Sequence, residues 1–158
     1  MDTLTADELI CGLQLPPALA RALVERRWRR PLESHLRRVF RERPIRAEFY
    51  DLPALRHANR RWHVERDPAF VGHPDAKAPP GDIDPTRSLL LGVLGPDLPF
   101  ALDYRVTSGE PRVVYLHSGG DRWITVARDI EQLLVSLHLD GLGERRTPAS
   151  TPPCPAPR

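Results

Sequence analysis

Hydrophobic positions in the first third of the chain recur at helical spacing. Leu19 and Leu23 lie one turn apart, and Leu36 and Phe40 repeat this interval beyond Pro31. A proline inside such a pattern breaks a helix, because its ring clashes with the preceding turn and it lacks an N–H. The spacing therefore predicts one amphipathic helix on each side of Pro31.

An additional short helix is expected ahead of these two. Thr5 and Glu8 have the spacing of a capping box, in which the two residues satisfy each other's free backbone N–H groups. We expect this helix to span residues 6–13. The segment Leu15-Pro16-Pro17 should end it and begin the next helix, because proline is favoured in a first helical turn.

From residue 45 the helical period gives way to alternation. Ile45, Ala47 and Phe49 alternate with charged or polar residues, which predicts a half-buried strand. Helical spacing then returns over residues 52–62. Residues 72–85 have no period and contain four prolines and two glycines, which indicates an exposed loop.

Four short apolar or alternating runs follow, at residues 89–94, 100–104, 112–116 and 123–126. Strands joined by such short turns pair antiparallel. A final amphipathic helix should begin after Asp129, end near Asp140 and lie across one side of the sheet. The predicted fold is α+β, an antiparallel meander of four to six strands with N-terminal helices and a C-terminal helix packed on it.

Length and composition indicate one domain. The chain has 158 residues, of which 41% are hydrophobic and 6% aromatic, and a domain typically has about 100–200 residues. We expect the domain to span residues 1–144. Residues 145–158 are rich in proline and should form a disordered tail, because they cannot bury enough apolar surface to become ordered.

The same composition predicts a cytoplasmic protein without a membrane span. The longest apolar runs have only three or four residues, whereas a membrane-spanning helix needs about 20. The first residues lack the basic and apolar stretches of a secretory signal. Cys11 and Cys154 lie at opposite ends of the chain, without the paired spacing of a zinc or redox site.

The formal net charge is +2, but it is unevenly distributed. Residues 1–66 carry +5 and residues 67–158 carry −3. Arg37, Arg38 and Arg41 cluster on one predicted helix, as phosphate contacts would require. Glutamates interleave with these arginines, so we do not expect a nucleic-acid partner. An Arg-rich nucleic-acid-binding or regulatory adaptor protein stays open as the alternative function.

One cluster superficially offers a base, a nucleophile and an orienting acid. His117, Ser118 and Asp121 lie within five residues of one another. The members of a working triad usually come from distant segments, because the base must be held against the nucleophile. We interpret these three residues as a polar turn and expect no catalytic residues.

A cation site is the other chemical possibility. His73 could gather around an ion with Asp75, Asp82 and Asp84. Proline-stiffened acidic loops are more often solvated, and the chain has neither a helical pair of histidines nor a phosphate-binding glycine motif. We therefore expect no metal and no cofactor.

The second half of the chain carries a more specific pattern. Residues 99–105 read P-F-A-L-D-Y-R, followed by V-V-Y at 113–115 and W-I-T-V-A at 123–127. This order and spacing resemble the SUKH superfamily, named partly for yeast cell-wall-assembly regulators, over about residues 84–139. We interpret Trp123, Asp103 and Tyr104 as structural residues, with Trp123 as a core anchor and Tyr104 facing the same side as Leu102. The matching residues are Leu102, Asp103, Tyr104, Trp123 and Ala127.

The resemblance implies a non-enzymatic binding module that needs no cofactor. Many bacterial members of the superfamily are similar to immunity proteins, which neutralise toxins, often nucleases, by direct binding. We therefore expect a cognate toxin as partner and a chain that is a monomer or a homodimer. Two contact surfaces are candidates: the acidic loop with Asp75, Asp82 and Asp84, which we prefer because loops on rigid scaffolds often carry recognition, and the basic helix with Arg37, Arg38 and Arg41.

Overall fold

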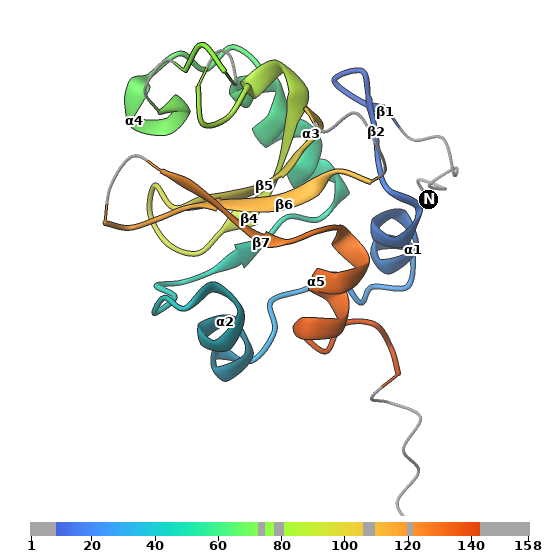
Figure 1. The fold of residues 1–158 in the computed structure, drawn as a ribbon. Helices are drawn as coiled ribbons and strands as arrows, with labels where there is room; N and C mark the ends of the chain where they lie inside the picture. The colour runs from blue at the N-terminus through green and yellow to red at the C-terminus, as the bar shows by residue number, and fades with distance from the viewer. Residues whose placement is uncertain (1–8, 73–74, 78–80, 106–109, 120–121, 143–158) are drawn as a thin grey trace, which may run out of the picture.

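The computed structural model describes residues 9–72, 75–77, 81–105, 110–119 and 122–142. Within them the fold is α+β, built on a five-stranded antiparallel sheet of order β3-β4-β5-β6-β7 (Figure 1). The strands are β3 (Glu48–Phe49), β4 (Ser88–Val93), β5 (Pro99–Asp103), β6 (Arg112–Leu116) and β7 (Trp123–Ala127). The predicted antiparallel meander is confirmed, because β4 to β7 follow one another in both sequence and space.

Helices lie on both sides of this sheet. They are α1 (Pro17–Val24), α2 (Glu33–Phe40), α3 (Leu52–Trp62), α4 (Pro68–Val71) and α5 (Ile130–Ser136), with one 3₁₀ turn, η1 (Pro85–Arg87). Figure 1 shows α2 and α5 below the sheet and α3 and α4 above it. The larger hydrophobic cluster joins α1, α2 and α5 to one face, and a smaller cluster around Trp62 covers part of the other.

Local sequence signals explain where several helices begin. The carboxylate of Asp51 accepts a hydrogen bond from the N–H of Ala54 over 3.0 Å at the start of α3. Asp129 caps α5 in the same way, through the N–H of Gln132 over 2.8 Å. These side chains satisfy N–H groups that have no partner inside the helix. The helices predicted on each side of Pro31, over residues 52–62 and after Asp129 are confirmed in type, although α1 ends at Val24, well before Pro31.

The helix expected over residues 6–13 is wrong in the part that the structure describes. A hairpin of β1 (Leu9–Ile10) and β2 (Leu13–Gln14) occupies this segment. Cys11 and Gly12 form its two-residue turn with φ of 50° and 80°, the positive values that tight hairpins require. Thr5 and Glu8 lie outside the described residues.

Three further boundaries differ from the sequence prediction. The strand expected from residue 45 is reduced to β3, and Ile45 is 57% exposed. Helix α4 precedes the predicted 72–85 loop and begins where Asp67 accepts from the N–H of Ala69 over 3.0 Å. Helix α5 ends before Asp140, because the backbone reverses at His138 with φ of 59°. The predicted tail at 145–158 lies outside the described residues.

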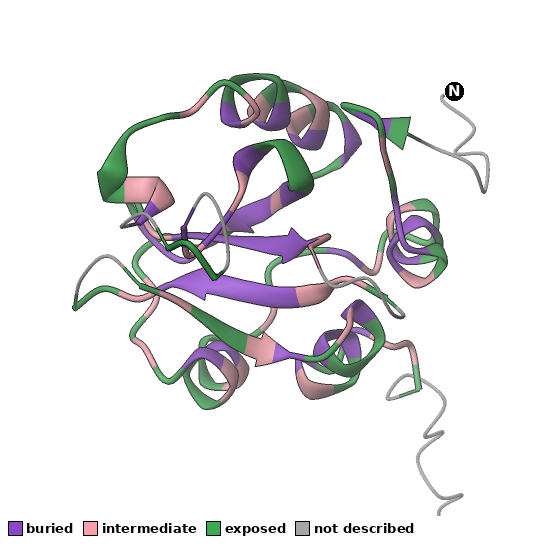
Figure 2. Ribbon diagram, turned by 45° about the horizontal axis from the view of Figure 1, so that its top comes forward, coloured by how far each residue is buried: buried purple, intermediate pink, exposed green. Residues whose placement is uncertain are grey.

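The central strands form the most buried part of the fold. All five residues of β5 are buried, whereas the middle of β7 is exposed at Ile124 and Thr125 (Figure 2). Strand β7 is the last strand of the sheet. Among the described residues, no helix combines the length and the apolar character needed to cross a membrane.

Candidate functional site

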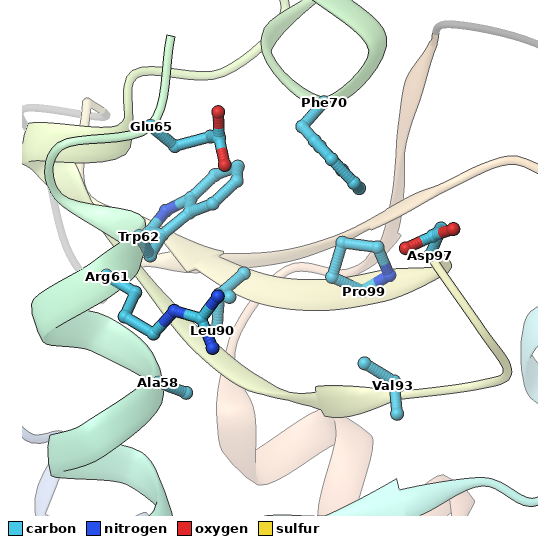
Figure 3. A pocket seen from close by; sticks show the side chains of 9 residues that line it. All are labelled: Ala58, Arg61, Trp62, Glu65, Phe70, Leu90, Val93, Asp97 and Pro99. Atoms are coloured by element: carbon cyan, nitrogen blue, oxygen red, sulfur yellow. The ribbon is translucent and has the colours of Figure 1, made fainter. Parts of the chain in front are cut away.

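A pocket of about 230 Å³ opens between the end of α3, helix α4 and the turn that joins β4 to β5 (Figure 3). Its floor is apolar and consists of Leu90, Val93 and Pro99 from the two strands. The aromatic rings of Trp62 and Phe70 form its walls. Figure 3 shows both rings directed toward the space above Pro99. The pocket is thus an aromatic-walled cavity on the sheet face opposite the main core.

The Trp62 wall is fixed by a chain of hydrogen bonds. Its indole N–H donates to the hydroxyl of Ser88 over 2.8 Å, and that hydroxyl donates to the carbonyl of Asp84 over 2.8 Å. The indole also packs against Trp123, with ring centroids 5.8 Å apart. Because its polar atom is paired and its ring is packed, Trp62 holds one orientation.

A buried asparagine holds α3 against the floor of the pocket. The side chain of Asn59 accepts from the N–H of Leu90 over 2.7 Å and donates to the carbonyls of Leu90 (3.0 Å) and Leu55 (2.8 Å). Asn59 is 0% exposed. Strand β3 pairs only with Gly92 and Val93 of β4, so the Asn59 amide serves the main-chain groups of Leu90 and joins the helix to the strand.

Three charged side chains surround the opening. Arg61 projects from α3, Asp97 from the β4–β5 turn, and Glu65 from the segment after α3 (Figure 3). The Glu65 carboxylate is held in place because its Oε1 accepts from the N–H groups of Arg66 and Asp67, both over 2.9 Å. Two carboxylates and one guanidinium give the lining a formal charge of −1.

A second depression of about 370 Å³ lies on the other side of Glu65. Pro68, Val71 and Pro85 supply apolar lining, and Asp84 adds a carboxylate. Glu65 therefore separates two neighbouring hollows, one on each side of α4. The second hollow has the larger volume, but the aromatic walls belong to the first.

The predicted acidic loop lies next to these hollows, but its three aspartates make different contacts and do not form one cluster. Asp84 accepts from both the N–H and the hydroxyl of Thr86, over 2.9 and 2.7 Å, and so begins η1. Asp82 is half-buried, and its main-chain carbonyl accepts from Arg105 over 2.6 Å. Asp75 is exposed and accepts from the N–H of Lys77. Of these three aspartates, Asp84 alone is part of the lining of the second hollow.

Part of the predicted basic cluster on α2 makes contacts within this protein. Arg37 pairs with Glu33 over 3.0 Å, and Arg38 donates to the carbonyl of Ser136 at the end of α5 over 2.7 Å. Arg41 is exposed and ends the helix with φ of 55°. Two of the three guanidinium groups thus make intramolecular contacts.

The residues expected to be structural occupy two different environments. Leu102 is fully buried and Ala127 nearly so, both in the main core. Tyr104 packs against the same core, donates its hydroxyl to the carbonyl of Gln14 over 2.6 Å, and has a pKa raised by burial. Trp123 differs from the prediction of a core anchor, because it is half-buried and packs on the opposite sheet face.

Asp103 is the most buried carboxylate of the described residues. Its side chain is 0% exposed and lies between Arg105 at 3.1 Å and Arg112 at 2.9 Å. Burial alone would raise the pKa of Asp103, but hydrogen bonds from Arg105 and Arg112 outweigh it and lower the pKa below its ordinary value. Arg105 also donates to the carbonyl of Gly81, so this cluster fixes the loop that leads into η1.

The residues considered for catalysis do not form a triad in the described part of the chain. The ring of His117 lies 3.4 Å from the carboxylate of Glu42, and its Nδ1 accepts from the N–H of Gly119. Asp121 and His73 lie outside the described residues. Among the residues that are described, no three His, Cys, Asp or Glu side chains gather closely enough to hold a metal ion.

The sequence predicted the helix over residues 52–62, at the end of which Trp62 lies, but it pointed to no site there. Phe70 and Glu65 carried no signal, because they become neighbours of β4 and β5 only through the packing of α3 and α4. Comparison of the chain with protein-family models, curated proteins and solved structures returned no significant match.

Proposed function

We propose that this protein is a non-enzymatic binding module that neutralises a cognate toxin by direct binding. The observation that supports a binding role is the fixed, aromatic-walled pocket beside α4. Small-molecule sites usually have volumes of about 300–1,000 Å³. A hollow of about 230 Å³ is better suited to a single anchoring side chain from another protein.

Fixed walls favour such a role on energetic grounds. Protein interfaces concentrate their binding energy in a few side chains that fill well-packed pockets. Because Trp62 and Asn59 are already held by hydrogen bonds, a partner need not order them on binding. A pocket that is formed in advance therefore loses less conformational entropy when it is occupied.

The toxin-neutralising part of the proposal comes from the resemblance to the SUKH superfamily over about residues 84–139. That stretch contributes the floor residues Leu90, Val93 and Pro99, together with Asp97 at the opening. A protein that blocks a toxin needs a shaped and charged surface but no reactive group. The pocket and its charged opening meet that requirement.

The alternative, a nucleic-acid-binding or regulatory adaptor protein, is disfavoured by the contacts of the basic helix. Phosphate binding requires several guanidinium groups directed outward from one face. On α2, Arg38 is bonded to the end of α5 and Arg37 is paired with Glu33. A salt titration with generic duplex DNA tests the alternative, and tight, salt-sensitive binding would favour it over the toxin proposal.

The toxin proposal is tested by expressing the small domains encoded next to this chain's reading frame. We expect one of them to arrest growth and this protein to restore it. The two purified proteins should form a complex in calorimetric titration. If no neighbouring domain is toxic, or if toxicity persists with a well-folded chain present, the proposal fails.

The pocket's part in this binding is tested by filling it. Ala58 lines the pocket from α3, so Ala58→Trp should obstruct it and weaken the complex at least about tenfold, as loss of an anchoring side chain does. Ser34→Trp is the matched control, because Ser34 is exposed on α2, on the other side of the sheet. Thermal melts of both variants show whether they fold.

A further inference from the structure

The pocket beside α4 combines two aromatic rings with an uneven distribution of charge. Trp62 and Phe70 form its walls, and a cation near an aromatic face is attracted by the ring's quadrupole. Figure 3 shows the Glu65 carboxylate beside the indole of Trp62 and Asp97 near Pro99, while the Arg61 side chain extends from α3 to the Leu90 end of the floor. The negative charge thus lies near the rings and the positive charge lies at the Leu90 end of the floor.

We propose that this pocket receives an arginine side chain of the partner protein, an inference that rests on the proposed function. The planar guanidinium would stack on an aromatic wall and donate to the carboxylates of Glu65 and Asp97. Its methylene stem would lie on the apolar floor of Leu90 and Pro99.

The same geometry disfavours other occupants. An acidic side chain would find one guanidinium, that of Arg61, and two carboxylates. A purely apolar side chain would fill the floor but would displace water from Glu65 and Asp97 without replacing its hydrogen bonds. Lysine has the right charge, but its compact ammonium group does not stack as a planar guanidinium does. Arg61 is placed to donate to main-chain carbonyls of the bound segment.

The probe for this inference is N-acetylarginine amide, with N-acetylcitrulline amide as a neutral analogue of nearly the same shape. The three tryptophans give three indole N–H signals in a proton–nitrogen correlation spectrum. Trp62 lines the pocket, and the indole of Trp123 is bonded to its Phe70 wall, so both signals should shift on titration. Trp28 packs against Phe49 in the main core, and its signal should stay in place.

Neutral variants of the two pocket carboxylates show whether these groups bind the arginine probe. Glu65→Gln and Asp97→Asn should each weaken binding of the arginine probe about three- to tenfold, the range expected for partly exposed ionic contacts. Glu131→Gln is the matched control, because Glu131 is exposed on α5, across the sheet. N-acetylglutamate amide tests the opposite charge and should produce no shift.

The inference is overturned if the citrulline or glutamate probe binds as well as the arginine probe, or if the variants leave binding unchanged. Its failure is distinguishable from failure of the proposed function. A partner protein that binds the Glu65→Gln and Asp97→Asn variants normally would contradict the arginine site and leave the binding role intact. Arginine binding by a chain that neutralises no toxin would contradict only the proposed function.

Discussion

The indole N–H of Trp123 donates to the main-chain carbonyl of Phe70 over 2.6 Å, joining strand β7 to helix α4. Helix α4 has four residues, far fewer than an isolated helix needs to be stable. Because Phe70 forms one wall of the pocket, the shape of the proposed binding site depends on a strand distant in sequence.

Trp123→Phe tests this dependence. The substitution keeps an aromatic ring beside Trp62 but removes the donor to Phe70, which should lower the free energy of unfolding by about 1–2 kcal/mol. Amide exchange should also accelerate at Val71 and Gly72, whose N–H groups close α4. Ile124→Val, at an exposed position of the same strand, is the control. Unchanged exchange at α4 would show that the indole does not hold it.

Asp103 should contribute strongly to stability because its buried carboxylate satisfies two arginines. Asp103→Asn removes the charged carboxylate that both Arg105 and Arg112 contact, and breaking a buried ion pair costs about 3–5 kcal/mol. Urea denaturation measures this loss. Replacement of the exposed Glu131 by Gln should change the midpoint little.

The Asp103 carboxylate should also make the free energy of unfolding depend on pH in the acidic range. Its pKa in the folded protein is lowered below the ordinary value of about 3.9, chiefly by Arg105 and Arg112 acting against burial. A group of this kind stabilises the fold above its unfolded pKa and loses that contribution as the pH falls through the folded pKa. We expect stability to decline below about pH 4, and less steeply in Asp103→Asn. If stability fell equally steeply with pH in the natural chain and in Asp103→Asn, Asp103 would not be the group responsible.

A pair of histidines leads us to expect that the stability of the fold also depends on pH at milder acidity. The rings of His35 and His138 stack with centroids 4.2 Å apart. Burial, followed by the positive charges of His138 and Arg38, lowers the pKa of His35. The unfolded chain then binds the proton more readily, so stability should fall as the pH drops through about 6.5.

His138→Asn checks this effect, because asparagine tolerates the positive φ of 59° at this position. Urea midpoints at about pH 7.5 and pH 5 should differ less in the variant than in the natural chain. An equal difference in both proteins would assign the pH dependence to other groups.

Gly92, the one glycine in the described strands, should be difficult to replace. A Cβ at this position would overlap the carbonyl oxygen of Glu48 and would lie 2.8 Å from the ring of Phe100. Both neighbours belong to the sheet and its core, so Gly92→Ala should destabilise the fold by about 4 kcal/mol or more. Gly95→Ala is the control, since its new methyl group would meet Ile45 at 3.4 Å. Similar melting temperatures for the two variants would contradict the close approach.

Local patterns predicted the repetitive part of this fold well. The helix beginning at Asp51 and the helix beginning at Asp129 follow from capping residues and apolar spacing, which act within a few residues. The sequence did not predict the hairpin at Cys11-Gly12, because this pair is not one of the usual Asn-Gly or Asp-Gly signals of a turn with positive φ. Helix α4 was missed because its four residues are too few to show a period.

The sequence by itself determined the α+β class, the antiparallel order of the last four strands, the helix over residues 52–62 and the start of the last helix after Asp129, since these depend on short-range spacing and turn length. Only the tertiary structure decided that Trp62, Phe70 and Asp97 share one pocket, and that Asp103 lies between Arg105 and Arg112. The pocket residues come from α3, α4 and the β4–β5 turn. They meet because burying the second face of the sheet brings α3 over it, a long-range packing effect that no local pattern encodes.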